Sequence, residues 1–187
     1  MKSLLAQLQI NPIIAAVHAE ASLKSAVESD CRVLFLLSGS IMDTIVQVDQ
    51  IHSAGKKCIV HLDLIDGLSG KEGAVDVIHH FTAADGIIST RVNQIKRARQ
   101  LGLAAIQRGF MIDSRSLKSF ESQVQLSRPD FVELLPGLLP QIIADLKTRI
   151  SPPIIVGGLI RYKSDVIAAI RAGAIAVSVS QPDIWSM

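Results

Sequence analysis

Eight short and almost wholly apolar segments alternate along this chain with stretches of helical periodicity. The segments predict strands at Ile13–Val17, Val33–Leu37, Cys58–Leu62, Gly86–Ser89, Ala104–Gln107, Phe131–Leu135, Ile154–Val156 and Ala176–Val179. Helices are predicted at Ser22–Ser29, Met42–Ala54, Lys71–Phe81, Val92–Leu101, Ser114–Leu126, Leu139–Arg149 and Tyr162–Ala172, with a short turn in the tail. Strands that are apolar on both faces are typical of parallel sheets covered by helices. The pattern therefore predicts an α/β fold, a compact (β/α)8 TIM-like barrel.

The length of the chain restricts how this pattern can be built. Its 187 residues, 49% of them hydrophobic, suit a single domain spanning residues 1–187. Barrels of this kind usually take roughly 200 residues or more, so the loops must be short. A flavodoxin-like open sheet is the alternative, but it leaves three of the eight predicted strands unexplained. Gly55, Gly102 and Gly173 each follow a helical run, which fits the left-handed position after a helix.

Charge and composition exclude several classes of protein. A net charge of +2 argues against nonspecific coating of nucleic acid. No apolar run reaches the ~18 residues of a membrane span, and the first residues lack a signal-peptide pattern. We therefore expect no membrane association and a cytoplasmic location. Cys31 and Cys58 lie within apolar segments, which predicts buried free thiols. No Cys/His spacing resembles a zinc site, and no metal is expected.

The last two predicted strands end in small residues. Pro153–Leu159 reads PIIVGGL and Ile175–Ser180 reads IAVSVS. In barrels of this class, the loops after strands seven and eight often hold a phosphate on backbone N–H groups. The alternative is that the glycines only make a tight turn and the serines cap a short helix. On this pair of segments alone the two interpretations are balanced. The candidate phosphate-binding residues are Gly157, Gly158, Ser178 and Ser180.

Further polar residues stand within or just after predicted strands, toward the working face of a barrel: Asp63 follows the third strand and Glu133 lies within the sixth. Asp63 and Glu133 could bind the hydroxyls of a polyol, act as acid and base, or hold a metal. The structural alternative is that they cap a loop or pair with an arginine. Alternation along a strand predicts that His61 and Asp63 share a face, directed inward. Three basic residues could neutralise a phosphate, namely Lys71, Arg91 and Arg108.

The sequence shows little sign of catalytic machinery. No GxSxG, Walker A or GxGxxG segment follows a strand. No lysine stands in the middle of a late strand, where a Schiff-base aldolase would need one. We therefore expect a protein that binds a small phosphorylated polyol without a cofactor and is not an enzyme. The alternative is a barrel enzyme acting on such a polyol phosphate, namely a lyase, an isomerase or a prenyltransferase.

A basic stretch lies in the middle of the chain. From Arg91 to Lys118 there are seven basic residues and one acidic residue, Asp113. Such a surface could hold phosphates without a high overall charge. On charge alone, an ordinary solvated helix face is the favoured interpretation. These basic residues include Lys96, Arg97, Arg99, Arg115 and Lys118.

Several of these motifs occur together in one known family. The segments are VHLDLIDGLSGKEGAVDVI (Val60–Ile78), DGIISTR (Asp85–Arg91), AIQRGFMIDSRSL (Ala105–Leu117), PDFVELLPGLLPQII (Pro129–Ile143), PIIVGGLI (Pro153–Ile160) and AVSVSQPDIW (Ala176–Trp185). In this order they resemble the glycerol-3-phosphate-responsive antiterminators of bacterial glycerol operons. One departure is Val179, where the family pattern has threonine. This change is expected to remove a hydroxyl near the phosphate.

The resemblance implies a TIM-like barrel with glycerol 3-phosphate as its effector. It also implies leader mRNA of glycerol-utilisation genes as the partner, with termination prevented and the transcript stabilised. Aromatic residues make up only 4% of the chain, so RNA contact is expected through phosphates and shape, with a homodimer as one arrangement. The candidate RNA-binding residues lie in the basic stretch and are Lys96, Arg97, Arg99, Arg115 and Lys118. Binding of the effector is expected to order the loop Asp66–Glu72.

Overall fold

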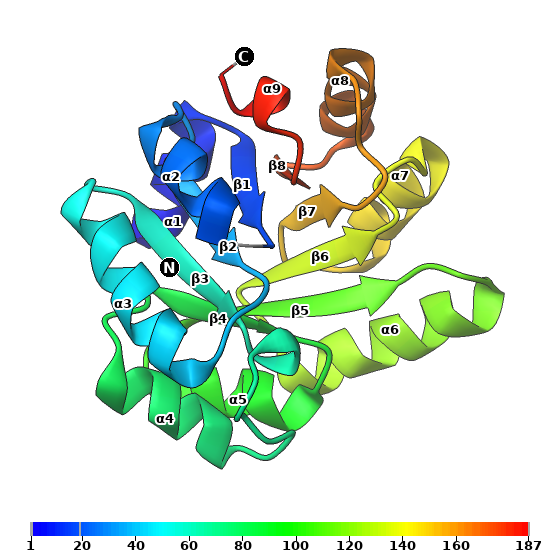
Figure 1. Cartoon of the computed structure of the whole chain (residues 1–187). Helices are drawn as coiled ribbons and strands as arrows, with labels where there is room; N and C mark the ends of the chain where they lie inside the picture. The colour runs from blue at the N-terminus through cyan, green and yellow to red at the C-terminus, as the bar shows by residue number, and fades with distance from the viewer. Residues whose placement is uncertain (1, 19, 187) are drawn as a thin grey trace.

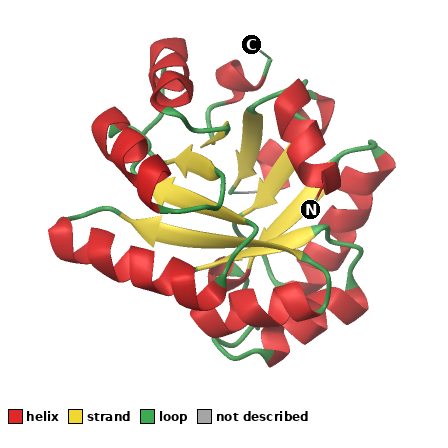
Figure 2. Ribbon diagram, turned by 180° about the vertical axis from the view of Figure 1, so that it is seen from behind, coloured by secondary structure: helices red, strands yellow, loops and turns green. Residues whose placement is uncertain are grey.

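Eight parallel strands close into a barrel (Figures 1 and 2). The computed structural model describes residues 2–18 and 20–186. Each strand pairs with the next, and β8 pairs with β1 through the register Ile13↔Val177. The strands are β1 Ile13–Val17, β2 Val33–Leu36, β3 Lys57–His61, β4 Gly86–Ser89, β5 Ala104–Phe110, β6 Phe131–Leu135, β7 Ile154–Gly157 and β8 Ala176–Val179. The predicted (β/α)8 barrel is confirmed, and the closing pair excludes the open sheet.

Helices surround the barrel, one after each strand (Figure 2). They are α2 Glu20–Glu28, α3 Ile41–Ser53, α4 Gly73–Phe81, α5 Val92–Gln100, α6 Ser114–Ser127, α7 Pro140–Arg149, α8 Lys163–Ala172 and α9 Pro182–Trp185, with a 3-10 turn, η1, at Leu62–Leu64. One further helix, α1 at Lys2–Ile10, precedes β1 and was not predicted. Strand β5 continues three residues beyond its predicted end at Gln107.

Local signals in the sequence set where several helices begin and end. Ser40 caps α3 by accepting a hydrogen bond from the backbone N–H of Asp43, whose carboxylate in turn accepts from the N–H of Ser40. Asp113 caps α6 through the N–H of Ser116 at 2.7 Å. The three glycines predicted to follow helices all have positive φ, namely Gly55 at 73°, Gly102 at 79° and Gly173 at 112°. These short-range contacts keep the loops brief, as a barrel of this length requires.

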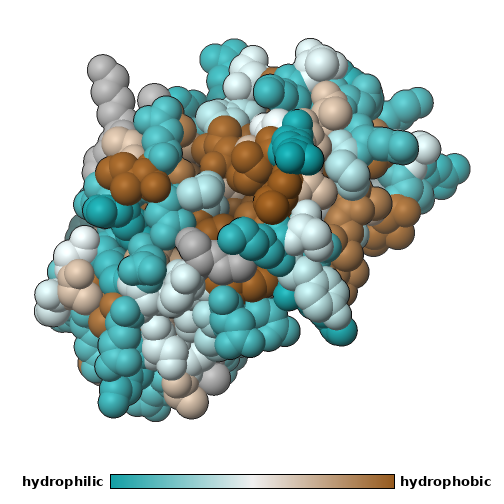
Figure 3. Space-filling model, turned by 90° about the horizontal axis from the view of Figure 1, so that it is seen from above, coloured by the Kyte–Doolittle hydropathy of each residue, from teal (hydrophilic) through white to brown (hydrophobic). Residues whose placement is uncertain are grey.

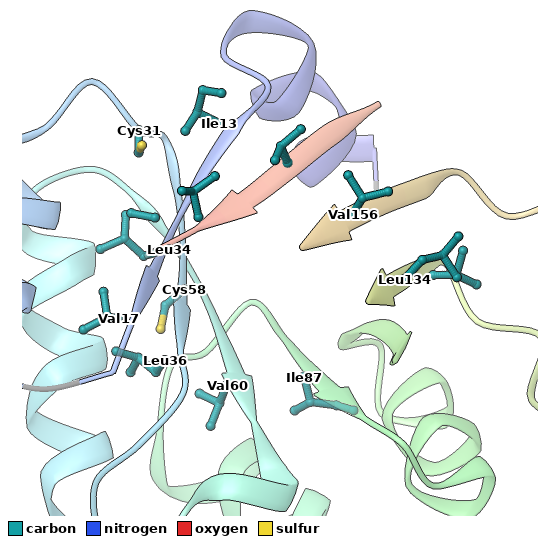
Figure 4. Packing of buried hydrophobic residues seen from close by; sticks show 14 of the residues in the cluster. Ile13, Val17, Cys31, Leu34, Leu36, Cys58, Val60, Ile87, Leu134 and Val156 are labelled. Carbon is teal, nitrogen blue, oxygen red and sulfur yellow. The ribbon is translucent and has the colours of Figure 1, made fainter. Parts of the chain in front are cut away.

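Apolar side chains form two layers, one on each side of the barrel wall. The outer layer lies between strands and helices and includes Leu34, Val60 and Val156 (Figure 4). The inner layer fills the barrel with residues such as Phe35 and Ile59. Helix α1 adds Leu4 and Leu8 to this inner layer, beside residues that begin strands, namely Val33, Ala104, Phe131 and Ala176. The amino end of the barrel is therefore closed by apolar packing, and polar chemistry is left to the carboxyl end.

Two further predictions concern the thiols and the membrane. Cys31 and Cys58 are both free and buried, as predicted. Desolvation raises the pKa of each thiol, so neither is a ready nucleophile. Among the described residues, no helix has the length and apolar character needed to cross a membrane.

The surface carries apolar residues at one end of the molecule. Viewed from the end where α8 and α9 lie, a continuous apolar area occupies the middle and hydrophilic residues surround it (Figure 3). Exposed apolar side chains on α8 and just before it are Leu159, Tyr162 and Ile167. Surfaces of this kind commonly contact other molecules. The homodimer stays a prediction.

Candidate functional site at the carboxyl end of the barrel

Four polar side chains point into the barrel at its carboxyl end. Residues two apart on a strand share a face, so the inner-layer residues Ile59, Ile106, Phe131 and Ala176 fix the direction of their neighbours. By this alternation His61, Arg108, Glu133 and Ser178 face inward, and all four are buried. They come from β3, β5, β6 and β8, so the closed barrel brings together residues that are far apart in the sequence.

A buried ion pair lies at the centre of this group. Arg108 and Glu133 stand opposite each other in the β5–β6 register. The Nε of Arg108 donates to Oε2 of Glu133 at 2.7 Å, and the Oγ of Ser178 donates to Oε1 at 2.6 Å. Both carboxylate oxygens are thus engaged. Among the described residues, none bonds the two Nη atoms of Arg108, whose side chain is 8% exposed. Four N–H donors of a buried guanidinium are therefore available to a ligand.

Gly157 faces the same group from β7. A Cβ at this position would overlap the hydroxyl of Ser178 and lie 3.0 Å from Oε1 of Glu133. Gly158 then has a φ of 74° and Leu159 a φ of 62°, so the chain turns sharply here. The tight turn of the structural interpretation is present, and a phosphate site at Gly157, Gly158, Ser178 and the exposed Ser180 stays a prediction.

Asp63 does not share the inward face with His61, contrary to the parity prediction. Strand β3 ends at His61 and the 3-10 turn η1 begins at Leu62, so the alternation of the strand stops before Asp63. Its carboxylate turns to the end of β4, where it accepts from the N–H of Thr90 at 2.7 Å and from Nε of Arg91 at 3.1 Å. Burial raises the pKa of Asp63, but bonds from Thr90 and Arg91 outweigh it and leave the pKa below its usual value.

The polar loop that follows η1 is held to α5. Gln94 is fully buried on α5, and its Nε2 donates to the carbonyls of Ser69 and Lys71, both at 3.1 Å. The guanidinium of Arg91 lies directly on Gly70, where a Cβ would come within 2.6 Å of Cζ. The side chain of Lys71 is exposed. Arg91 thus connects Asp63, the loop and the rim of the barrel.

His61 is a site residue that the sequence analysis placed on a face but did not name as ligand-binding. Its side chain is buried, and neither ring nitrogen has a partner among the described residues. Desolvation, together with the nearby charge of Arg108, lowers its pKa to about 3, so the ring is neutral. The available signal was a histidine that ends an otherwise apolar strand. Desolvation and Arg108 also lower the pKa of His18, at the end of β1.

The remaining predicted residues lie on the helices outside the barrel. Arg97 bonds to Asp76 of α4, with Nε 2.9 Å from Oδ1, and Arg99 lies 3.6 Å from Asp130. The side chains of Lys96, Arg115 and Lys118 are exposed on the neighbouring helices α5 and α6. In the described part of the chain, no three His, Cys, Asp or Glu residues gather as a metal site would require.

The side chain at position 179 faces away from the interior of the barrel. Val179 belongs to the outer apolar layer, while Ser178 before it faces inward. A threonine at this position would direct its hydroxyl toward the helices. The departure therefore removes a hydroxyl from the helix side of β8, while the position of the phosphate stays a prediction.

The fold and the polar carboxyl end define the class: a closed (β/α)8 barrel whose buried charges gather where barrels of this fold bind small molecules. Deoxyribose phosphate aldolase from Aeropyrum pernix shares the fold, with a TM-score of 0.73 over 98% of this chain and 95% of that one, at 14% identity. Within the class, the chain belongs to the glycerol-3-phosphate responsive antiterminator family, whose model matches residues 13–185.

Similar proteins agree with this membership. The crystal structure of a glycerol uptake operon antiterminator regulatory protein from Listeria monocytogenes has a TM-score of 0.91 at 35% identity, covering 94% of this chain and 95% of that one. A related protein from Thermotoga maritima has a TM-score of 0.83 at 26% identity, covering 94% and 98%. The uncharacterised protein YgcP of Escherichia coli (strain K12) is 39% identical over 184 residues, 98% of this chain and 96% of its own.

Proposed function

We propose that this protein is a glycerol-3-phosphate-responsive transcription antiterminator of the cytoplasm. With its effector bound, it binds leader mRNA of glycerol-utilisation genes and promotes read-through and transcript stability. Family membership supports this function. The observation that carries the ligand side is the guanidinium of Arg108, which is almost fully buried at the carboxyl end and has both Nη atoms free of described partners. A buried guanidinium with free donors suits an anionic group such as a phosphate.

The proposed effector site uses charges at two depths. Arg108 lies inside the barrel with Glu133, while Arg91 and Lys71 lie at the rim. The phosphate lies within reach of these cations and of the small residues Gly157, Gly158, Ser178 and Ser180. The sequence assigns the glycerol hydroxyls to the carboxylates of Asp63 and Glu133, both of which already accept hydrogen bonds within the chain.

The proposed RNA surface is the outer side of α5 and α6. Lys96, Arg115 and Lys118 are exposed there and supply the charge for RNA phosphates. Arg97 and Arg99 contribute less, because Asp76 and Asp130 already pair with them. The few aromatic residues favour contact through backbone and shape.

The polar loop after η1 connects the proposed effector site with the proposed RNA surface. Arg91 lies on Gly70, and Gln94 of α5 holds the carbonyls of Ser69 and Lys71. A phosphate that draws on Arg91 changes how this loop is held, and the change reaches the helix that presents Lys96. The effector thereby favours the conformation that binds RNA.

The experiment measures binding of a leader RNA hairpin at fixed salt, with and without glycerol 3-phosphate. We expect tighter binding with the effector. The triple variant Lys96→Glu/Arg115→Glu/Lys118→Glu should lose RNA and keep the effector, and Lys24→Glu on α2 is the matched control for charge reversal. Absence of RNA binding in both conditions would overturn the proposal.

The alternative, an enzyme acting on a phosphorylated polyol, has less support. Both oxygens of Glu133 already accept hydrogen bonds, and the carboxylate of Asp63 is engaged at the end of β4. Within the described strands β4 to β8 there is no lysine. Incubation with glycerol 3-phosphate followed by ³¹P NMR tests the alternative, since turnover of the ligand would favour it.

A further inference from the structure

One polar side chain at the carboxyl end, that of His61, takes no part in the hydrogen bonds that join Arg108, Glu133 and Ser178. His61 ends β3, faces into the barrel and is only 2% exposed. Both Nδ1 and Nε2 are shut off from solvent without a partner among the described residues. Native proteins pair nearly all buried polar atoms, so a side chain with two unpaired nitrogens indicates a group that joins it from outside the chain.

The protonation state of the ring restricts what that group can be. Desolvation and the positive Arg108 lower the pKa of His61 to about 3, so near pH 7 one nitrogen donates and the other accepts. An ionised phosphate oxygen only accepts hydrogen bonds, so it suits only the donating nitrogen. An ammonium group only donates hydrogen bonds, so it suits only the accepting nitrogen. A hydroxyl group can donate and accept, so it suits either nitrogen. The ring is therefore matched to alcohol groups of a ligand.

The neighbouring charges point the same way. Arg108 and Asp63 both lie close enough to affect the pKa of His61, in opposite directions, and the free Nη atoms of Arg108 offer donors to an anion. Glu133 and Ser178 are committed to each other and to Arg108. Anionic and alcoholic ends of one ligand thus have separate partners, the guanidinium for the first and the imidazole for the second.

We infer that His61 determines specificity at this site by binding a hydroxyl of a phosphorylated polyol, so that the protein selects polyol phosphates over phosphates lacking that hydroxyl. The inference rests on the proposed function for the site but not on RNA binding. It differs from the effector site as predicted, in which the hydroxyls were assigned to Asp63 and Glu133.

The experiment compares three ligands by calorimetry: glycerol 3-phosphate, 3-hydroxypropyl phosphate and 2-hydroxypropyl phosphate. The second lacks the middle hydroxyl and the third lacks the terminal one. With wild-type protein, at least one deoxy analogue should bind at least about tenfold more weakly, because a buried ring nitrogen is left unpaired. His61→Leu should lower the affinity for glycerol 3-phosphate to that of this analogue and abolish the difference between them.

Two further variants separate recognition from folding. His61→Gln keeps a donor and an acceptor and should recover part of the discrimination. His80→Leu replaces an exposed histidine of α4 and should leave all three affinities unchanged. If His61→Leu does not fold, ¹⁵N NMR of the wild-type ring nitrogens decides. Saturation with glycerol 3-phosphate should shift the His61 signals by hydrogen bonding without protonating the ring.

Each unfavourable result has a definite meaning. Unchanged affinity and discrimination in His61→Leu, unshifted His61 signals, or no glycerol 3-phosphate binding by wild-type protein would overturn the inference. Loss of discrimination in a protein that never binds leader RNA would overturn the proposed function and leave the role of His61 standing. If RNA binding depends on glycerol 3-phosphate but His61→Leu still discriminates fully among the three ligands, the proposed function stands and the role of His61 is overturned.

Discussion

Two arginine–carboxylate pairs lie at the carboxyl end of the barrel and differ mainly in depth. Arg108 and Glu133 face each other inside the barrel at 2.7 Å, with side chains 8% and 0% exposed. Arg91 and Asp63 meet at the rim at 3.1 Å, with side chains 53% and 14% exposed. In the inner pair, each charge depends on the other because water is excluded. In the outer pair, water solvates the arginine, which is free to exchange Asp63 for a ligand.

The largest expected effect comes from breaking the inner pair. Glu133→Ala leaves the guanidinium of Arg108 buried without its partner, which should reduce the free energy of unfolding by about 3–5 kcal/mol. Urea denaturation at pH 7 measures the loss. The double variant Arg108→Met/Glu133→Leu removes both charges and should recover most of it. Equal losses in the single and double variants would show that the uncompensated charge is not the cause.

A middle effect is expected at the outer carboxylate. Asp63→Asn removes a charged acceptor of the Thr90 and Arg91 bonds and should reduce the free energy of unfolding by about 1–3 kcal/mol at pH 7. Because the folded state holds the pKa of Asp63 below its usual value, the unfolded chain binds the proton more readily. The stabilisation is complete above the ordinary pKa of 3.8 and is lost as pH falls through the lower folded pKa.

Urea denaturation of wild type and Asp63→Asn at several pH values from 7 to 3 follows this prediction. The gap between the two proteins should narrow in the acid range. A gap that stays constant down to pH 3 would show that the carboxylate charge contributes nothing.

The smallest effect on stability is expected at the outer arginine. Arg91→Ala should change the free energy of unfolding by less than ~1 kcal/mol, since the side chain is half exposed. The same variant should weaken glycerol 3-phosphate binding, because the proposed site draws on this guanidinium. Arg91→Lys is the control that keeps the charge without the planar fork. A loss of stability as large as that of Glu133→Ala would contradict the claim that the outer pair contributes less to stability than the inner pair.

Sequence patterns predicted the barrel well because each buried strand carries its own apolar signal. Prediction failed where a residue depends on a distant partner. The predicted strand ended at Gln107, whereas β5 continues through Arg108, which pairs with Glu133 of the next strand. Helix α1 was missed although Leu4 and Leu8 lie one turn apart, because only the barrel interior reveals what they pack against.

Prediction of the candidate site succeeded and failed for the same reasons. Polar residues that interrupt or follow apolar strands identified Glu133 and Asp63, and the sequence resemblance identified the family. The sequence did not reveal that η1 turns Asp63 outward, nor that both nitrogens of His61 lack partners. Those facts depend on backbone direction and on neighbours contributed by other strands.

The missing side chain at Gly157 has an evolutionary consequence. Because a Cβ there would displace the hydroxyl of Ser178 from Glu133, positions 157 and 178 are not free to change independently. Gly157 can be replaced by a larger residue only after Ser178 has been replaced by a residue without a hydroxyl, or after β7 and β8 have moved apart. Related barrels should therefore keep or lose the glycine and the serine as a pair.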